Sequence, residues 1–185
     1  MSYMQEIERF VPVNEQEQAD QREILRWIHA APADILCRTQ TAAHIISSGL
    51  IFSPSLEEVL FVRHRVYDTW CWTGGHADGE EDLLAVALRE AREETGLELV
   101  EPLSREILSL DILPVWGHQK KGKYVSSHLH LSAAYALVAE KDQPLRSAPE
   151  ENTGVAWFPV KNWEQTVTEP YILYVYRKIL DRIRS

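Results

Sequence analysis

The stretch GHADGEEDLLAVALREAREETGL, residues 75–97, holds the strongest structural and chemical pattern in this sequence. Its second half predicts a helix over residues 83–95, because Asp82 can cap the start and Gly96 suits the left-handed position just past the end. At about 100° per residue, one face of this helix collects apolar and small side chains and should pack against the core. The residues on that face are Leu84, Ala87, Leu88, Ala91 and Thr95.

Three glutamates gather on another face of the same predicted helix. Glu90 lies three residues before Glu93 and four before Glu94, so the carboxylates are neighbours within one turn. Each like-charge pair destabilises an isolated helix by roughly 0.2–0.5 kcal/mol, and Arg89 offsets only part of this. A divalent cation offsets far more, and Mg²⁺ is commonly shared between one or two carboxylates and the phosphates of a substrate. The pattern therefore indicates a metal site for phosphate chemistry.

The spacing of the charged residues and glycines resembles the signature of the Nudix hydrolases, G-x5-E-x7-R-E-U-x-E-E-x-G-U, where U is aliphatic. All the fixed positions are present: Gly75, Glu81, Arg89, Glu90, Glu93, Glu94 and Gly96. A chance match is on the order of one in a million at ordinary residue frequencies. A bare E-x-x-E-E run is usually a solvated helix face, but the flanking matches argue against that here. The departures are small: Glu80 stands where many members have glycine, and Ala91 fills an aliphatic position.

The resemblance implies which residues of this box hold a metal. Glu93 and Glu94 are the expected core ligands, Glu90 supports them, and Glu81 holds the preceding loop or joins the metal ligands. The implied cofactor is Mg²⁺, with Mn²⁺ as the alternative. The implied reaction is hydrolysis of the pyrophosphate linkage in a nucleoside diphosphate attached to another moiety, by attack of a metal-activated water.

Other expected catalytic and structural roles follow from the same family pattern. Arg89 orients a glutamate of the cluster, and Gly75 and Gly96 set the loop geometry at the two ends of the box. A glutamate in the loop before a later W-F strand often completes the metal site or acts as general base. Glu151 is the first candidate for that role and Glu150 the second, with a solvated loop charge as the plain alternative.

Substrate contacts are expected from two strands that precede the box. Arg63 and Arg65 alternate along a strand, so both can reach phosphates from one side, unless they lie on an exposed strand face. Trp70 and Trp72 also share a face; Trp72 is a candidate platform for a nucleobase, while core packing is the competing interpretation.

A pair of histidines and a basic cluster are the remaining candidates. His128 and His130 lie on one face of a later strand and suit substrate contact, proton transfer or a transition metal, or are ordinary structural histidines. His76, next to the box glycine Gly75, has the same alternative roles. The lysines at 120, 121 and 123 form a solvated loop or a lid over an anionic substrate.

The order of predicted elements indicates a mixed α/β protein. Residues 1–40 read as a polar helical extension, with Asn14 capping a helix, and residues 41–185 as the Nudix domain. Strands are expected at 42–52, 58–66, 70–73, 106–115, 128–138 and 155–160, and a C-terminal helix at 171–183. The resemblance implies a mixed β-sheet sandwiched between helices. The extension is a cap over the site, a dimer contact or a packed appendage.

The composition limits the classes of binding partner that we expect for this protein. With 19 basic and 28 acidic residues the net charge is −9, which argues against a protein that binds nucleic-acid polymers through a basic surface. A nucleotide substrate remains expected, because the metal supplies positive charge. The sequence has no apolar run of membrane-spanning length and no secretory signal pattern. Cys37 and Cys71 are expected to be free thiols, so we expect a soluble, cytoplasmic protein, with a homodimer as one arrangement common in the family.

Two other functions remain open beside the hydrolase. One is a non-catalytic nucleotide-binding or sensor module that uses the same fold, although such modules usually have a broken box. The other is an isomerase of the isopentenyl diphosphate type, and Cys71 is the one residue in the sequence that supports it. The box does not identify the substrate, because substrate choice lies in loops outside it.

Overall fold

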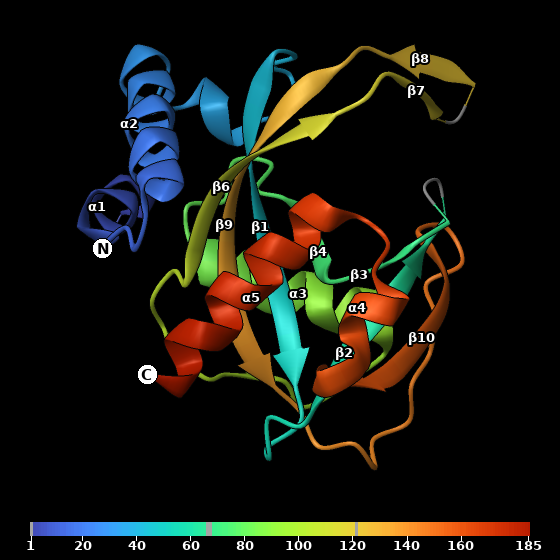
Figure 1. Ribbon diagram of the computed structural model, residues 1–185. Helices are drawn as coiled ribbons and strands as arrows, with labels where there is room; N and C mark the ends of the chain where they lie inside the picture. The colour runs from blue at the N-terminus through green and yellow to red at the C-terminus, as the bar shows by residue number, and fades with distance from the viewer. Residues whose placement is uncertain (1, 66–67, 121) are drawn as a thin grey trace.

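A mixed β-sheet with helices on both faces forms the centre of the protein in the computed structural model, which describes residues 2–65, 68–120 and 122–185 (Figure 1). Strand β1 (Ala43–Phe52) runs through the middle and is buried along its whole length. It pairs in parallel with β9 (His128–Val138) and antiparallel with β2 (Glu58–His64) and β4 (Thr73–His76). The predicted sheet between helices is confirmed.

The remaining strands extend the sheet on both sides of this centre. β10 (Asn152–Pro159) and β3 (Trp70–Cys71) pair with β2, while β5 (Glu101–Pro102) and β6 (Ser109–Val115) pair with β9. The main path through the sheet is β10-β2-β1-β9-β5. Because β1 and β9 are parallel, their N-terminal ends meet at one edge, and that edge carries histidines on both strands.

Helix α3 (Leu83–Thr95) covers one face of the sheet and confirms the predicted helix over 83–95. The Asp82 carboxylate accepts the backbone N–H of Ala85 at 3.0 Å, and Gly96 ends the helix with φ 74°, a left-handed value that glycine adopts without a Cβ clash. Ala87 and Ala91 are fully buried against the sheet. The core on this side also takes in Ile45 and Ile51 of β1.

Helix α5 (Pro170–Arg184) covers the opposite face, together with the short helix α4 (Trp163–Thr166). Tyr176 is fully buried there and stacks on Phe61 with ring centroids 5.4 Å apart. Leu50 and Phe52 of β1 belong to this second core. Figure 1 shows α5 in front of the strands and α3 behind them, so the sheet separates two apolar layers.

The N-terminal helices α1 (Tyr3–Arg9) and α2 (Glu15–Ala30) pack beside β6 and join the core on the α3 side. Asn14 caps α2 as expected, since its side chain accepts the N–H of Glu17 at 2.8 Å. Ile24 and Ile28 are fully buried. The turn after α2 leads through a 3-10 segment, Asp34–Leu36, to β1, and a second 3-10 segment, Val160–Asn162, precedes α4.

Several predicted boundaries differ from the structure. The polar link at 117–123 contains two short strands, β7 (His118–Lys120) and β8 (Lys123–Val125), which form a ribbon extending away from the main sheet (Figure 1). Gly122, with φ 78°, permits the tight turn between them. The strand expected at 70–73 is divided into β3 and β4, and β6 begins at Ser109 rather than at 106. Residues 66, 67 and 121 of the predicted strand, turn and lysine cluster lie outside the described residues.

None of the described helices is both long enough and apolar enough to cross a membrane.

Candidate active site

Three carboxylates, Glu90, Glu94 and Glu151, come together at one side of the sheet. Each offers an oxygen, and these oxygens lie within 4.8 Å of one another. Glu90 and Glu94 come from successive turns of α3, and Glu151 comes from the loop that leads into β10. Glu90 is 9% exposed and Glu94 6%, whereas Glu151 is open to solvent. Two buried carboxylates therefore stand beside an accessible one.

A backbone N–H of β4 and a side-chain amide of β10 fix the position of Glu94. Its Oε1 accepts the N–H of Gly74 at 2.8 Å. The buried amide of Asn152 donates from Nδ2 to the Glu94 carbonyl at 2.8 Å, which ties the end of α3 to the start of β10. The following residue in the box loop, Gly75, leaves room for the other buried carboxylate: a Cβ there would lie 2.3 Å from Cδ of Glu90. The box glycine thus lets the helix carboxylate approach the strand.

Burial raises the pKa of both inward-facing glutamates. The pKa of Glu94 rises to about 8, mainly through burial and also through the charges of Glu151, Glu90 and Glu93, although the Gly74 N–H opposes the shift. Burial likewise raises the pKa of Glu90, against the opposing effect of Arg89, whose Nη1 lies 2.5 Å from Glu90 Oε1. A cation among these oxygens would favour the ionised carboxylates. The cluster is thus suited to exchange a proton for a metal ion.

This shift gives a pH prediction for the metal-free protein. Because the folded-state pKa of Glu94 exceeds its unfolded value, the folded state binds more protons, so the free energy of unfolding should fall as pH rises from about 4.5 to about 8. Glu94→Gln removes that contribution. In EDTA, we expect the Tm of the variant relative to wild type to be higher at pH 8.5 than at pH 5. An equal Tm difference at both pH values would contradict the prediction, and excess Mg²⁺ should reverse the trend in wild type.

Glu93 and Arg89 occupy the outer side of the same helix. The Glu93 side chain is 59% exposed, and its Oε2 lies 4.0 Å from Nη1 of Arg89. The same guanidinium contacts Glu90 and, at 3.5 Å, the Oε2 of Glu80. Arg89 therefore orients Glu90 while it lies within reach of Glu93. Among the described residues, the compact three-carboxylate group contains Glu90 and Glu94 but not Glu93.

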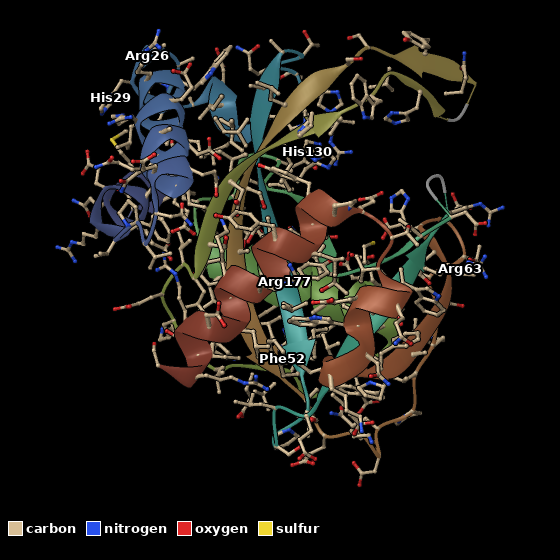
Figure 2. All side chains as sticks on the ribbon, in the orientation of Figure 1. Arg26, His29, Phe52, Arg63, His130 and Arg177 are labelled. Carbon is tan, nitrogen blue, oxygen red and sulfur yellow. The ribbon has the colours of Figure 1, made fainter. Side chains whose placement is uncertain are left out.

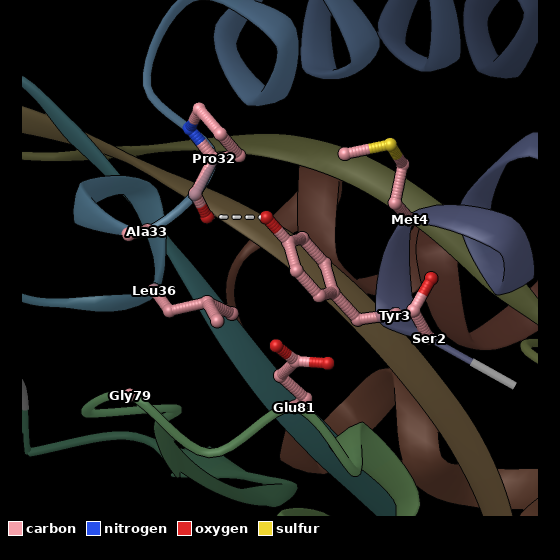
Figure 3. A pocket seen from close by; sticks show the side chains of 8 residues that line it. All are labelled: Ser2, Tyr3, Met4, Pro32, Ala33, Leu36, Gly79 and Glu81. Carbon is pink, nitrogen blue, oxygen red and sulfur yellow. Dashed lines mark hydrogen bonds between the residues drawn. The ribbon is translucent and has the colours of Figure 1, made fainter.

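Glu81 is not a member of this carboxylate group. Figure 3 shows its side chain directed into a cavity of about 510 Å³ between the box loop and the N-terminal segment. Tyr3 and Leu36 line the same cavity, and the Tyr3 hydroxyl donates to the carbonyl of Pro32 at 2.5 Å. In this arrangement Glu81 faces the helical extension.

The two arginines expected to bind phosphate lie at the β2 end, near the Glu151 loop. Arg63 donates from Nε to Asp68 at 2.8 Å. Arg65 donates its backbone N–H to the carbonyl of Glu151 at 3.0 Å and its Nη1 to the carbonyl of Pro149 at 2.8 Å. Arg65 therefore supports the loop that carries Glu151. Arg63 is on the exposed side of the strand (Figure 2).

Trp72 packs in the interior rather than in an open position. It is 9% exposed, its ring lies 5.2 Å from that of Tyr176, and its backbone N–H donates to the Tyr176 hydroxyl at 2.8 Å. Trp70 packs partly buried against the same core and meets Phe158 edge-on. This geometry agrees with the core-packing interpretation of the tryptophans.

Four histidines lie together on the face of the sheet opposite α3. The sequence pattern predicted the pairing of only two of them, His128 and His130. His128 and His130 lie with their Nε2 atoms 3.3 Å apart. His44 of β1 and His76 of β4 join them, with the His44 ring centroid 5.0 Å from His76 and 4.9 Å from His128. Burial lowers the pKa of His44, which favours its neutral form. His44 was missed because the parallel pairing of β1 with β9 has no local signal in the sequence.

Comparisons with known proteins agree with this fold. The family model described as NUDIX domain matches residues 43–178. A NUDIX-family hydrolase from Clostridium perfringens is 22% identical, with a TM-score of 0.52 over 76% of this chain and 97% of that one. The Nudix hydrolase RenU from M. smegmatis is 14% identical, with a TM-score of 0.55 over 76% and 86%. The NUDIX domain of Shewanella oneidensis NrtR, solved with ADP ribose, is 16% identical, with a TM-score of 0.54 over 79% and 92%.

At these identities the solved structures establish a shared fold. A search among curated proteins gave no match.

Proposed function

The chain belongs to the NUDIX family, and on that basis we propose that it is a metal-dependent hydrolase that cleaves the pyrophosphate linkage of a nucleoside diphosphate attached to another moiety. The observation that supports this most directly is the group formed by Glu90, Glu94 and Glu151. An intact box alone would be compatible with a helix whose carboxylates point apart. Here two buried carboxylates and one exposed carboxylate converge on one point.

The donor set fits a hard divalent cation. All three candidate ligands are carboxylates, and oxygen ligands are what Mg²⁺ and Mn²⁺ prefer. Glu90, Glu94 and Glu151 would hold the ion. Glu93, exposed on the outer side of α3 beside Arg89, would have to turn its side chain to join them. When bound, such an ion polarises a phosphoryl oxygen and lowers the pKa of a bound water.

The protein residues then divide the remaining tasks. Glu151 is the accessible carboxylate of the group and is positioned to accept a proton from the attacking water, as a general base needs contact with solvent and substrate. The 2.5 Å contact with Arg89 favours the ionised form of Glu90, against the opposing effect of burial. The N–H of Gly74 stabilises the charged form of Glu94. Arg65 fixes the backbone on both sides of Glu150. Arg63, exposed on β2 and paired with Asp68, is the arginine that we propose to contact a phosphate.

We propose a class of substrate, a nucleoside diphosphate attached to another moiety, rather than a single compound. The NrtR domain was solved with ADP ribose, a nucleoside diphosphate joined to a second sugar, and that compound heads the set to be tested. Both cysteines of this chain are free thiols, which is compatible with the reducing cytoplasm that we propose as its location.

The test is phosphate or nucleotide release from a panel of nucleoside diphosphate derivatives, each run with Mg²⁺, with Mn²⁺ and with EDTA. We expect at least one compound to be hydrolysed with either metal and none to be hydrolysed in EDTA. Hydrolysis that persists in EDTA would contradict a metal-dependent mechanism. Tight, metal-dependent binding of a nucleotide without turnover across the panel would instead favour the non-catalytic binding module.

A further inference from the structure

We propose that His44, His76, His128 and His130 form a second metal site, separate from the glutamates, which binds a first-row transition ion such as Zn²⁺. The proposal concerns a different set of ligands from those of the proposed hydrolase and does not depend on its activity. Nothing in the pyrophosphate chemistry described above uses this cluster.

The sheet register brings the four side chains to one place. β1 and β9 run parallel with His44 opposite His130, so these two residues lie on the same face. His128 is two residues earlier on β9 and shares that face. His76 comes from β4, where it stands opposite Ile46, two residues after His44 on β1. Three strands therefore direct imidazoles to the same side of the sheet.

The distances suit coordination of a single ion. Ring nitrogens of His44, His76 and His130 lie within 4.8 Å of one another. The Nε2 atoms of His128 and His130 are 3.3 Å apart. In a tetrahedral site with Zn–N bonds of about 2.0–2.1 Å, the nitrogens are separated by roughly 3.3–3.4 Å. One pair thus already has the spacing of two ligands, and the nitrogens of His44, His76 and His130 would close from within 4.8 Å to that spacing.

Hydrogen bonds from Nδ1 of two of the rings leave the other ring nitrogen, Nε2, with a lone pair that can bind a metal ion. Nδ1 of His44 lies 3.0 Å from the carbonyl of Gln40, and Nδ1 of His128 lies 2.8 Å from the carbonyl of Ser126. A carbonyl only accepts, so Nδ1 carries the proton in each neutral ring and Nε2 keeps a lone pair. A ligating histidine commonly donates its other ring N–H to a backbone carbonyl in this way.

The inner nitrogen of His44 also lacks any protein partner. His44 is 4% exposed, and its Nε2 is buried without a hydrogen bond to any part of the chain that the structure describes. A buried acceptor in that state is destabilising unless a ligand, ion or water satisfies it. The three neighbouring imidazoles make a metal ion the fitting occupant, because imidazole nitrogen is a preferred ligand for ions of this class.

The histidine site and the carboxylate site lie on opposite sides of the sheet. The side-chain position of Gly75 faces Glu90 on the α3 side, and the next residue on the strand, His76, faces the other way. One set offers only oxygens and the other only nitrogens, so the two select different ions. Figure 2 shows His130 near the point where the β7–β8 ribbon leaves the sheet. An ion there would tie the starts of β1 and β9 to the box loop.

The test uses untagged, EDTA-treated protein, because an added polyhistidine tag would bind the same ions. Zn²⁺ is titrated against a chromophoric chelator in millimolar Mg²⁺, and Co²⁺ is added separately to record its visible absorption. We expect one high-affinity Zn²⁺ per chain, a Co²⁺ spectrum typical of nitrogen ligands in a four-coordinate site, and a higher Tm with Zn²⁺. Mg²⁺ at the glutamates should not displace the ion.

Variants separate this site from the other candidates. The double variant His128→Ala/His130→Ala removes two half-buried ligands and should weaken Zn²⁺ binding by at least about 100-fold. The control His29→Ala removes an exposed histidine on α2, and Glu90→Gln/Glu94→Gln neutralises the carboxylate site; both should keep wild-type Zn²⁺ affinity. Circular dichroism verifies folding. Absence of saturable Zn²⁺ binding in folded wild type, its survival in the double histidine variant, or its loss in the glutamate variant would each overturn the proposal.

Discussion

Replacing Glu94 with glutamine is expected to lower kcat/KM for the hydrolysed substrate by about 10²–10³-fold, equivalent to roughly 2.7–4 kcal/mol of transition-state stabilisation. Glutamine has the same shape, and its amide oxygen can still accept the Gly74 N–H that Oε1 accepts at 2.8 Å. What disappears is the negative charge of a buried carboxylate in the three-glutamate group. Steady-state rates in saturating Mg²⁺ measure the effect, with circular dichroism to verify the fold.

Two further variants make the Glu94 result specific. Glu98→Gln changes an exposed glutamate just after α3 and should leave the rate unchanged. Glu93→Gln tests the carboxylate that the family pattern treats as an equal ligand but that is 59% exposed beside Arg89. A loss as large as that of Glu94→Gln would mean that Glu93 turns toward the ion when it binds. Retention of more than about one third of the wild-type rate by Glu94→Gln would remove Glu94 from the proposed metal ligands.

Helix α3 shows how much of the fold could be predicted from local sequence. Its start at Asp82, its end at Gly96 and its buried face all follow from interactions within a few residues. Such short-range effects are encoded in the order of residues, so spacing alone predicts them. The mixed α/β class was likewise predictable from the order of strands and helices, and the family resemblance implied the sheet between helices.

The direction of each glutamate depended on contacts that local spacing does not contain. Periodicity placed Glu90, Glu93 and Glu94 together on one face, yet Glu90 and Glu94 are buried and Glu93 is largely exposed. The difference arises because Gly75 leaves room for the Glu90 carboxylate, and the backbone N–H of Gly74 binds the carboxylate of Glu94. That approach is a tertiary property of the β1–β4 pairing.

The histidine cluster is the clearest case of long-range information. His128 and His130 are visible as an alternating pair, but His44 and His76 are 84 and 52 residues from His128 in the chain, as the residue numbers show. Only the parallel register of β1 on β9 and the antiparallel register of β4 on β1 unite them. The N-terminal extension also shows this limit. Its helices could be predicted from the sequence, but the buried polar contacts that they make with distant elements could not.

Replacing Lys178 with methionine is expected to reduce the free energy of unfolding by about 3–5 kcal/mol, because it leaves the buried carboxylate of Asp111 without its cation. The Lys178 ammonium on α5 lies 2.5 Å from Asp111 of β6 and 3.2 Å from Glu17 of α2. Both carboxylate side chains are fully buried, and that of Lys178 is 5% exposed. Only Glu17 has a second cationic partner in the described structure, Arg182 at 2.5 Å. Urea unfolding should show a lower midpoint with a similar slope.

Two further variants test whether the destabilisation comes from the loss of the Lys178 charge. Lys161→Met removes an exposed lysine and should change stability by less than about 0.5 kcal/mol. The double variant Lys178→Met/Asp111→Asn should recover part of the loss, because it removes the unpaired negative charge together with its cation. A single Lys178→Met variant as stable as wild type would show that the carboxylates do not need this ammonium. Recovery in the double variant would show that Lys178 and Asp111 stabilise the contact between α5 and β6 by neutralising each other's charge.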